Sequence, residues 1–518
     1  MAEQLCLPKS TLHNHLRAQK RRHQHPESAF WETKEGSEWL SRLVFATLYQ
    51  FGLKSEIGAG QLSEFFQLIR IHTHVGISEN ALRQQLKEME GLFVTYQQQC
   101  ESSATAPVSA RTVAMDETFF QQMMILVMMD LPSGYVFVET VAADRSFETW
   151  KAAVIPRLET LGLTVRHAIS DRAKALIKLA LNALDCESGA DLFHAQQDLG
   201  RWLSAPLARQ TKKAAAYQKD AQTLLAREET RKTEQRDFSE TGRLQAHVAE
   251  AEKQHAACLA AQKTYKAHRE AISHSIHPFN LSSSLHQDEA AILKTLQQES
   301  DALAALANTA KINDPKDKLG KFRRQHKALS QHVSIWWLWI HTLLDDLNTD
   351  QLTQDWVTTR LMPVVYWSHR ATQTKKPSDR TAYRNAWEKA VKTFDDDAFT
   401  KSLSSDVTQY WLAWCEETVT HFQRTSSAVE GRNGCLAQMY HNRRGLTEAR
   451  LKALTVIHNY GTFRTDGSTP ASRLYGQEFP DLFESLLGKM GPLPLPRRSR
   501  VKKKANPLIY KKCPSLSG

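Results

Sequence analysis

Residues 111–130 form two apolar runs, each long enough for a β-strand, and this stretch constrains the fold more than any other part of the chain. The first run carries a carboxylate, Asp116, among residues that favour burial. An unpaired charge is costly to bury, so Asp116 needs a local hydrogen bond, a basic partner or a metal ion. This stretch alone leaves the three options open.

The segments after residue 130 predict a mixed α/β fold. A strand, a helix, a strand, a helix and a short strand are expected over residues 135–142, 147–161, 164–170, 172–184 and 190–193. The order β-β-β-α-β-α-β predicts a mixed sheet with helices on its faces, the first strand central and the fourth beside it. Asp171 directly follows the fourth strand, so we expect it to lie close to Asp116.

Two carboxylates on adjacent strands repel one another unless a cation lies between them. Oxygen ligands at that spacing suit Mg²⁺, which keeps several waters and is often held by one or two carboxylates together with substrate phosphates. The sequence therefore predicts that Asp116 and Asp171 bind metal.

This order of elements, with one Asp on the first strand and one after the fourth, resembles the RNase H-like fold of DDE transposases and retroviral integrases. In that family a third carboxylate comes from a later helix, and Glu430 is the best match, with Asn433 three residues on and facing the same side. Basic residues follow about three turns later. The nearby Glu416 and Glu417 lack these companions.

A second mark of the resemblance follows the fifth predicted strand. Asp191 to His194 matches the Cys/Asp-x-x-His signature that some DDE transposase families carry after the second Asp. Those families place a large helical insertion between the signature and the Glu. This chain has more than two hundred residues there, over about 196–423.

The resemblance implies an insertion-sequence transposase of bacterial type that binds transposon ends and catalyses strand cleavage and strand transfer. Asp116 would bridge two Mg²⁺ ions, with Mn²⁺ as a substitute, while Asp171 binds one ion and Glu430 the other. The expected partners are double-stranded DNA of transposon ends and target, and further copies of the chain in a homodimer or larger oligomer. A nuclease of this fold without strand transfer, and a non-catalytic DNA-binding scaffold, remain alternatives.

Two N-terminal segments resemble helix-turn-helix units. In the first, Ser10 would cap a recognition helix with Lys9 and Arg17 as DNA contacts, although an isolated capped helix fits equally well. The second has a helix over 61–71, a turn over 72–77 and a helix over 78–90 that begins at a Ser N-cap. The second helix of this unit carries both acidic and basic side chains. That mixture fits a packing or dimerising role as well as it fits recognition of bases in a DNA groove.

Further DNA contacts are expected on and after the helix of Glu430. The candidates are Arg432, His441, Arg443 and Arg444. Arginine side chains in such positions suit phosphate contacts. For Arg443 and Arg444, pairing with acidic helices nearby is the alternative.

Composition agrees with a polyanion partner but does not require one. The 518 residues include 67 Lys and Arg against 56 Asp and Glu, a formal charge of +11. The seven cysteines form no CxxC pair, which predicts reduced thiols, and no apolar run approaches the length of a membrane span. We expect a cytoplasmic, nucleoid-associated protein without membrane contact.

The domain organisation follows from these features. We expect an N-terminal helical region, the first part of the catalytic domain, an all-helical insertion, the final catalytic helices and a basic tail, over residues 1–100, 101–195, 196–423, 424–475 and 476–518. Within the insertion, two long helices joined at Gly242 should form an antiparallel hairpin, and most tryptophans should lie in its core. Residues 97–108 read as a polar linker.

Overall fold

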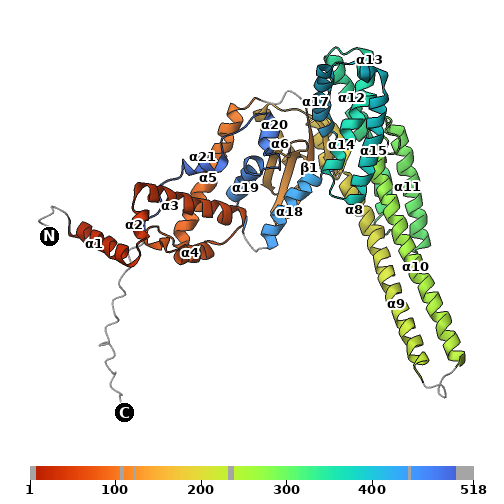
Figure 1. Ribbon diagram of the computed structural model, residues 1–518, viewed down its shortest axis with the longest axis horizontal. Helices are drawn as coiled ribbons and strands as arrows, with labels where there is room; N and C mark the ends of the chain where they lie inside the picture. Colours follow the sequence, from red (N-terminus) through yellow and green to blue (C-terminus); the bar gives the residue numbers. More distant parts are fainter. Residues whose placement is uncertain (1–7, 106–109, 121–122, 232–237, 442–444, 497–518) are drawn as a thin grey trace. The chain divides into compact units, whose positions relative to one another are not determined.

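The structure is a computed structural model that describes residues 8–105, 110–120, 123–231, 238–441 and 445–496. The chain forms two compact units (Figure 1). The smaller comprises Met1–Ala104, His441–Thr469 and Glu478–Gly518, and the larger comprises Thr105–Tyr440 and Pro470–Gln477. Among the described residues, no helix combines the length and apolar character needed to cross a bilayer.

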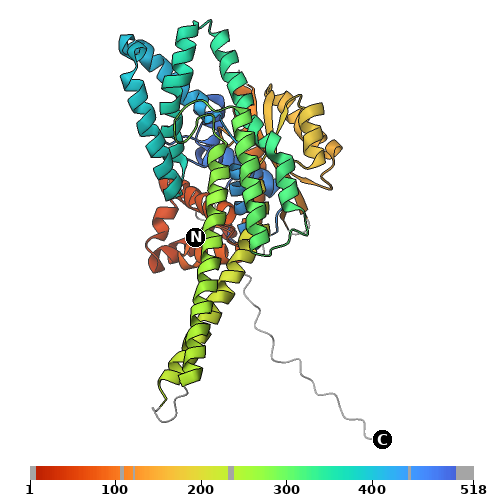
Figure 2. The same cartoon turned by 90° about the vertical axis from the view of Figure 1, so that its right-hand side faces the viewer.

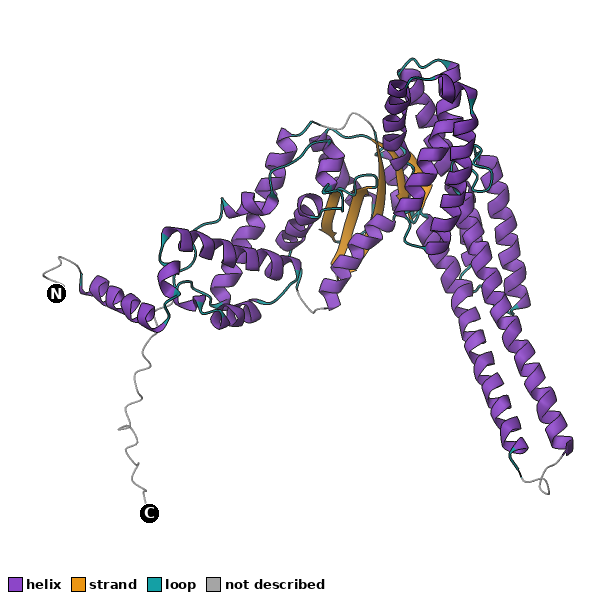
Figure 3. Cartoon of the chain, in the orientation of Figure 1, coloured by secondary structure: helices purple, strands orange, loops and turns teal. Residues whose placement is uncertain are grey.

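The larger unit contains a five-stranded mixed sheet, drawn in orange in Figure 3. Its strands are β1 (Arg111–Phe120), β2 (Met123–Asp130), β3 (Val136–Ala142), β4 (Val165–Ser170) and β5 (Glu187–Ala190). The order is β3-β2-β1-β4-β5, in which β1 runs antiparallel to β2 and parallel to β4. The predicted mixed α/β class, the central position of the first strand and the pairing of the fourth beside it are therefore confirmed.

The helices α6 (Phe147–Leu161) and α7 (Lys174–Asn182) connect the strands as expected. The Ser146 hydroxyl caps α6 at its start, and Gly162 ends it with a φ of +63°, a conformation that glycine adopts without strain. The fifth strand was expected over 190–193 but ends at Ala190, because Asp191 caps the helix α8 (Leu192–Leu199) instead. Aspartate is a preferred N-cap residue, and it stops the strand here.

The stretch expected to be a helical insertion, about residues 196–423, is helical in the structure. It consists of η3 (Gly200–Ser204), α9 (Ala205–Glu229), α10 (Phe238–Ser275), α11 (Glu289–Thr309), α12 (Lys318–Asp346), α13 (Gln351–Trp356), η5 (Val357–Leu361), α14 (Met362–Gln373), α15 (Pro377–Asp396), α16 (Ala398–Ser402) and α17 (Ser405–Thr420). The helices α9 and α10 pack along one another as the predicted hairpin (Figures 1 and 2). Gly242, expected at the turn, lies inside α10, so the chain reverses before it.

The predicted burial of the insertion's tryptophans is also confirmed. Six of them are buried in one apolar core and three more pack against it: Trp202, Trp336, Trp337, Trp356, Trp367 and Trp411, with Trp339, Trp387 and Trp414 at its edge. Aromatic residues at helical spacing therefore form packing contacts in this part of the chain.

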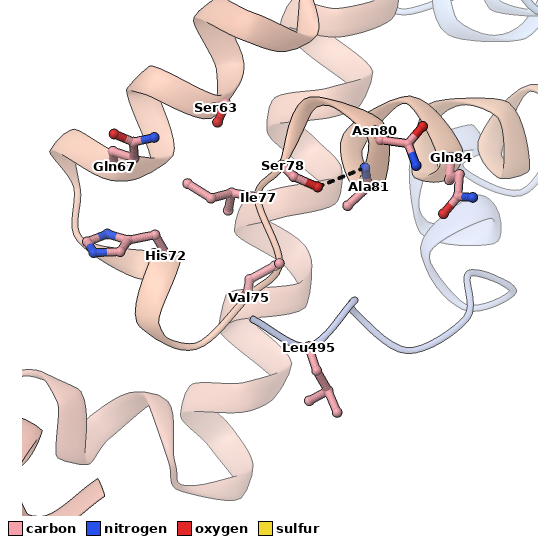
Figure 4. A pocket seen from close by; sticks show the side chains of 11 residues that line it. Ser63, Gln67, His72, Val75, Ile77, Ser78, Asn80, Ala81, Gln84 and Leu495 are labelled. Atoms are coloured by element: carbon pink, nitrogen blue, oxygen red, sulfur yellow. Dashed lines mark hydrogen bonds between the residues drawn. The ribbon is translucent and has the colours of Figure 1, made fainter. Parts of the chain in front are cut away.

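The smaller unit is helical. Its elements are α1 (Lys9–Gln24), α2 (Ser28–Trp31), α3 (Lys34–Thr47), η1 (Leu48–Lys54), α4 (Ala59–Leu68), η2 (Ile71–Thr73), α5 (Glu79–Ser103), α19 (Glu448–Gly461) and α21 (Leu482–Leu487). The helix, turn and helix expected over residues 61–90 are present as α4, η2 and α5, with the Ser78 hydroxyl accepting a hydrogen bond from Ala81 N at 3.3 Å (Figure 4). The expected linker over 97–108 is wrong for residues 97–103, because these residues continue α5. Tyr96, just before them, and Cys100, among them, are both buried.

The first predicted helix-turn-helix is represented by α1. This helix begins at Lys9, so Ser10 lies in its first turn and is not the N-cap. Its described side chains include no buried residue, and Lys9, Ser10 and Arg17 are exposed. Both interpretations of this helix, recognition helix and isolated helix, stay open.

Candidate metal centre

Three side chains from distant parts of the larger unit converge beside the sheet. Asp116 lies on β1, His194 on α8, and Glu430 in the first turn of α18 (Ser427–His441). One potential ligand atom from each lies within 4.8 Å of the other two. His194 Nε2 is 3.3 Å from Glu430 Oε1 and 3.8 Å from Asp116 Oδ1.

The Asp191 carboxylate holds the start of α18 against the start of α8. Oδ1 accepts hydrogen bonds from Phe193 N at 2.8 Å and from Ser426 N at 3.1 Å, and Oδ2 accepts one from the Ser426 hydroxyl. The Ser426 carbonyl in turn accepts from Glu430 N at 3.1 Å. A single buried carboxylate therefore sets where Glu430 stands relative to His194.

Asn433 lies where its spacing from Glu430 predicts, on the side of α18 that faces Asp116. Its Nδ2 donates to Asp116 Oδ2 at 3.0 Å, and the side chain is buried. This contact occupies one oxygen of Asp116 and leaves Oδ1 as the oxygen nearest His194. Asn433 therefore lies directly beside Asp116.

Arg432 has a different role from the DNA contact expected of it. Its guanidinium donates to both oxygens of Glu139 on β3, with Nε–Oε1 at 2.8 Å and Nη2–Oε2 at 2.6 Å. Both residues are buried, so the guanidinium is not presented to a phosphate in this structure. The pair attaches α18 to the sheet through a bidentate geometry that arginine and carboxylate share.

Neighbouring residues of β1 face opposite sides of the sheet, because successive side chains of a strand alternate. Asp116 contacts α18, whereas Glu117 accepts a hydrogen bond from Trp150 Nε1 on α6 at 3.4 Å. The helices α6 and α18 thus cover opposite faces. The candidate metal centre lies on the face that α18 covers.

Asp171 lies at the end of the sheet where the sequence predicts it. It is not one of the three converging residues, Asp116, His194 and Glu430. Its Oδ1 accepts a hydrogen bond from Ala173 N at 2.8 Å, at the start of α7. Burial, and after it the charge of Asp171, raises the pKa of the Glu117 carboxyl. Asp171 therefore acts electrostatically on Glu117, and its metal-binding role remains a prediction.

The electrostatics of the centre favour a bound cation. The pKa of the Asp116 carboxyl is raised to about 7: burial is the largest cause, the charge of His194 lowers it, and the charge of Glu430 raises it. Two carboxylates in a partly desolvated site repel one another, which a divalent ion between them would relieve.

The donor atoms of the centre also fit a metal ion. His194 Nε2 is buried and forms no hydrogen bond, although three carboxylates lie within 3.8 Å of it, including Asp191 at 3.6 Å. His194 Nε2 therefore lies close to these carboxylate oxygens without forming a hydrogen bond to any of them. Carboxylates suit Mg²⁺ and Mn²⁺ and imidazole suits Zn²⁺, so a mixed set of this kind fits a divalent cation.

The sequence identified His194 as part of a signature but missed it as a candidate ligand. The signal was present in the spacing, since Asp191 caps α8 and His194 follows one turn later on the same helix. Of the other expected DNA contacts, Arg443, Arg444 and the side chain of His441 lie outside the described residues.

A comparison with protein families gives a match over part of the chain. The model of a family described as a family of unknown function, DUF6399, matches residues 357–502. The matched range includes Glu430 and Asn433 and excludes Asp116 and His194. No curated protein and no solved structure matches the chain.

The buried ion pair yields a stability prediction. We expect Arg432→Ala to lower the free energy of unfolding by about 3–5 kcal/mol, because it leaves a buried carboxylate on Glu139 without its partner. Replacing both residues, by Arg432→Met and Glu139→Leu, should recover most of the loss. Denaturant unfolding followed by tryptophan fluorescence measures both changes. Unaltered stability of Arg432→Ala together with weakened DNA binding would restore the DNA-contact interpretation.

The raised pKa of Asp116 yields a pH prediction. Without metal, the folded state holds the Asp116 proton more tightly than the unfolded state, so wild-type stability falls as pH rises from 3.8 to about 7. The side chain of Asp116→Asn does not titrate, so this variant should not lose stability in this way as the pH rises. Above pH 7 it should be more stable than the wild type. Melting temperatures in EDTA across this range measure the difference.

Added metal should stabilise the wild type relative to its carboxylate variants, which is the reverse of the effect of raising the pH without metal. Mn²⁺ should raise the melting temperature of the wild type at pH 7.5 and leave Asp116→Asn and Glu430→Gln unchanged, since a ligand stabilises only the state that binds it. An equal Mn²⁺ effect in all three proteins would exclude these carboxylates as ligands.

Proposed function

We propose that this chain is a metal-dependent DNA phosphoryl transferase of the DDE transposase type, with an RNase H-like catalytic sheet. The observation that carries the proposal is the convergence of Asp116 and Glu430, supported by the hydrogen bond between Asp116 and Asn433, 317 positions apart in sequence. The strand order, with Asp116 on the central strand, supports the same fold family.

Asp116 and Glu430 are the residues that would hold the metal, with His194 as a nitrogen ligand. A divalent ion bound there would lower the pKa of a water or of a DNA 3′-hydroxyl and would stabilise the leaving oxygen. Asn433 fixes the orientation of Asp116 by donating to Oδ2, so that Oδ1 faces the other two donors. Asp191 fixes the orientation of Glu430 through the start of α18.

His194 contributes a nitrogen whose lone pair is available in the neutral imidazole. Its position between Asp116 and Glu430 suits a ligand role, because its Nε2 has no competing hydrogen bond. Asp171, at the same end of the sheet, is the candidate for the additional carboxylate that a second Mg²⁺ or Mn²⁺ ion would require. The residues therefore divide into ligands and the side chains that orient them.

The substrate in this proposal is double-stranded DNA. The formal charge of +11 favours association with a polyanion. The resemblance to DDE transposases extends the proposal to transposon ends and target DNA, and to a homodimer or larger oligomer that pairs two ends.

Cleavage of DNA by the purified chain tests the proposal. The substrates are a supercoiled plasmid that carries the DNA flanking the gene on both sides, and labelled duplexes from the same flanks, each in Mg²⁺, Mn²⁺ or EDTA. We expect metal-dependent nicking and joining, reduced at least about 100-fold by Asp116→Asn and by Glu430→Gln, because each variant removes a negative metal ligand.

A matched control and a separate binding measurement complete the design. Glu187→Gln, at an exposed position on β5, should cleave like the wild type. Binding of the same duplexes in EDTA should be unchanged in all variants. Nicking without joining would indicate a nuclease, and tight binding without cleavage in any metal would contradict an enzymatic role.

A further inference from the structure

The first three turns of α5 present a row of polar side chains on one side of the helix. Asn80, Gln84 and Lys87 follow one another at intervals of four and three residues, so they lie on the same side. All three side chains are exposed. No side-chain hydrogen bond or ion pair joins any of them to another described residue. This face is therefore available to a partner outside the chain.

The glutamates of the same turns each accept a hydrogen bond from a neighbour within the smaller unit. The contacts are Glu79 Oε2 with Arg83 Nη2 at 2.7 Å, Glu88 Oε1 with Gly491 N at 2.8 Å, and Glu90 Oε1 with Arg450 Nε at 2.6 Å. From the sequence, the mixed charge of this helix fits packing as well as DNA binding. The structure pairs two of the three carboxylates with arginine and leaves Lys87 free to bind a phosphate.

A hollow of about 420 Å³ lies beside this face, at the start of α5 (Figure 4). The helix α5 contributes Asn80 and Gln84 to its lining. From the other side, α4 contributes Ser63 and Gln67, and η2 contributes His72. The described residues that line the hollow include no Asp, Glu, Lys or Arg. The lining therefore offers neutral hydrogen-bond donors and acceptors from both helices.

This set of side chains matches the chemistry of duplex DNA. The major groove admits an α-helix, and the amide of Asn or Gln bonds N6 and N7 of adenine together. Asn80 and Gln84 are separated by about 6 Å along the helix axis, and base pairs by about 3.4 Å, so the two amides suit base pairs one or two steps apart. The hydroxyl and amide that α4 contributes suit phosphate oxygens, since the first helix of such a unit crosses the DNA backbone.

We propose that Asn80 and Gln84 are a base-reading pair that recognises adenine in the major groove of duplex DNA, with Lys87 on a neighbouring phosphate. The proposal rests on the proposed function, in which DNA is the substrate. It assigns α4, η2 and α5 to groove reading instead of packing or dimerisation, and it assigns the specificity to A·T pairs.

Selection of bound duplexes from a random-sequence pool in EDTA tests the base-reading pair, because it requires neither cleavage nor a known site. The wild type should enrich a motif with adenine at two positions one or two base pairs apart. Asn80→Ala and Gln84→Ala should each lose roughly 10-fold of the preference for adenine at one position and keep it at the other. Gln84→Arg should replace adenine by guanine at its position, because arginine bonds guanine O6 and N7.

Controls separate a base contact from a change in folding. Gln98→Ala removes an exposed amide farther along α5 and should select the wild-type motif. Duplexes in which 7-deazaadenine replaces a selected adenine lack the N7 acceptor, so they should bind the wild type more weakly and test the contact without any variant. Lys87→Gln should weaken binding to all duplexes alike and lower the slope of log K against log salt by about 1.

The outcomes also separate the base-reading pair from the catalytic proposal. An unchanged motif in both alanine variants would overturn the pair, as would a wild type that prefers no sequence. A wild-type dimer that dissociates in Gln84→Arg while the motif is unchanged would assign this face to a contact between copies and would also overturn it. Adenine selection by a chain that cleaves in no metal would support the pair and contradict the catalytic function. Metal-dependent cleavage with an unchanged motif in both alanine variants would do the reverse.

Discussion

The buried carboxylate of Asp191 is the contact on which the candidate site depends. It caps α8 and accepts two hydrogen bonds from Ser426, so it joins the points where the helical insertion leaves the sheet and returns to it. Between these points the chain traverses more than two hundred residues. Without such a tie, the entropy of a long connection would leave Glu430 without a fixed position beside β1.

The insertion itself is tied to the same junction. Arg424 is buried and donates to the carbonyl of Ile276, just after α10, at 2.8 Å, and its own carbonyl accepts from Leu192 N at 3.1 Å. The end of the long hairpin, the start of α8 and the start of α18 therefore meet in one hydrogen-bonded group. On the other side of α18, the pairing of Arg432 with Glu139 attaches the helix to the sheet. These contacts make the insertion part of the framework that sets the site.

The sheet and Asp116 were predicted for physical reasons, whereas Glu430 was predicted through the resemblance to DDE transposases. Apolar strands separated by helices determine a strand order with few alternatives, and a carboxylate in an apolar strand, Asp116, marks a position that needs a partner. Glu430 was the match to the third carboxylate that this resemblance implies, and its companion Asn433 distinguished it from the nearby Glu416 and Glu417. What local patterns could not supply were tertiary choices: whether Asp191 ends a strand or caps a helix, that Arg432 pairs with Glu139, and that His194 lies between the two carboxylates.

The central claim is that Asp116, His194 and Glu430 bind one divalent cation together. Anomalous X-ray diffraction from crystals of the full chain grown with Mn²⁺ tests it most directly, because it locates the ion independently of any activity. The account predicts an anomalous peak within about 2.0–2.6 Å of a donor atom from each of the three residues. A structure with Mn²⁺ bound elsewhere, or held by Asp116 and Asp171 while His194 and Glu430 remain uncoordinated, would contradict it.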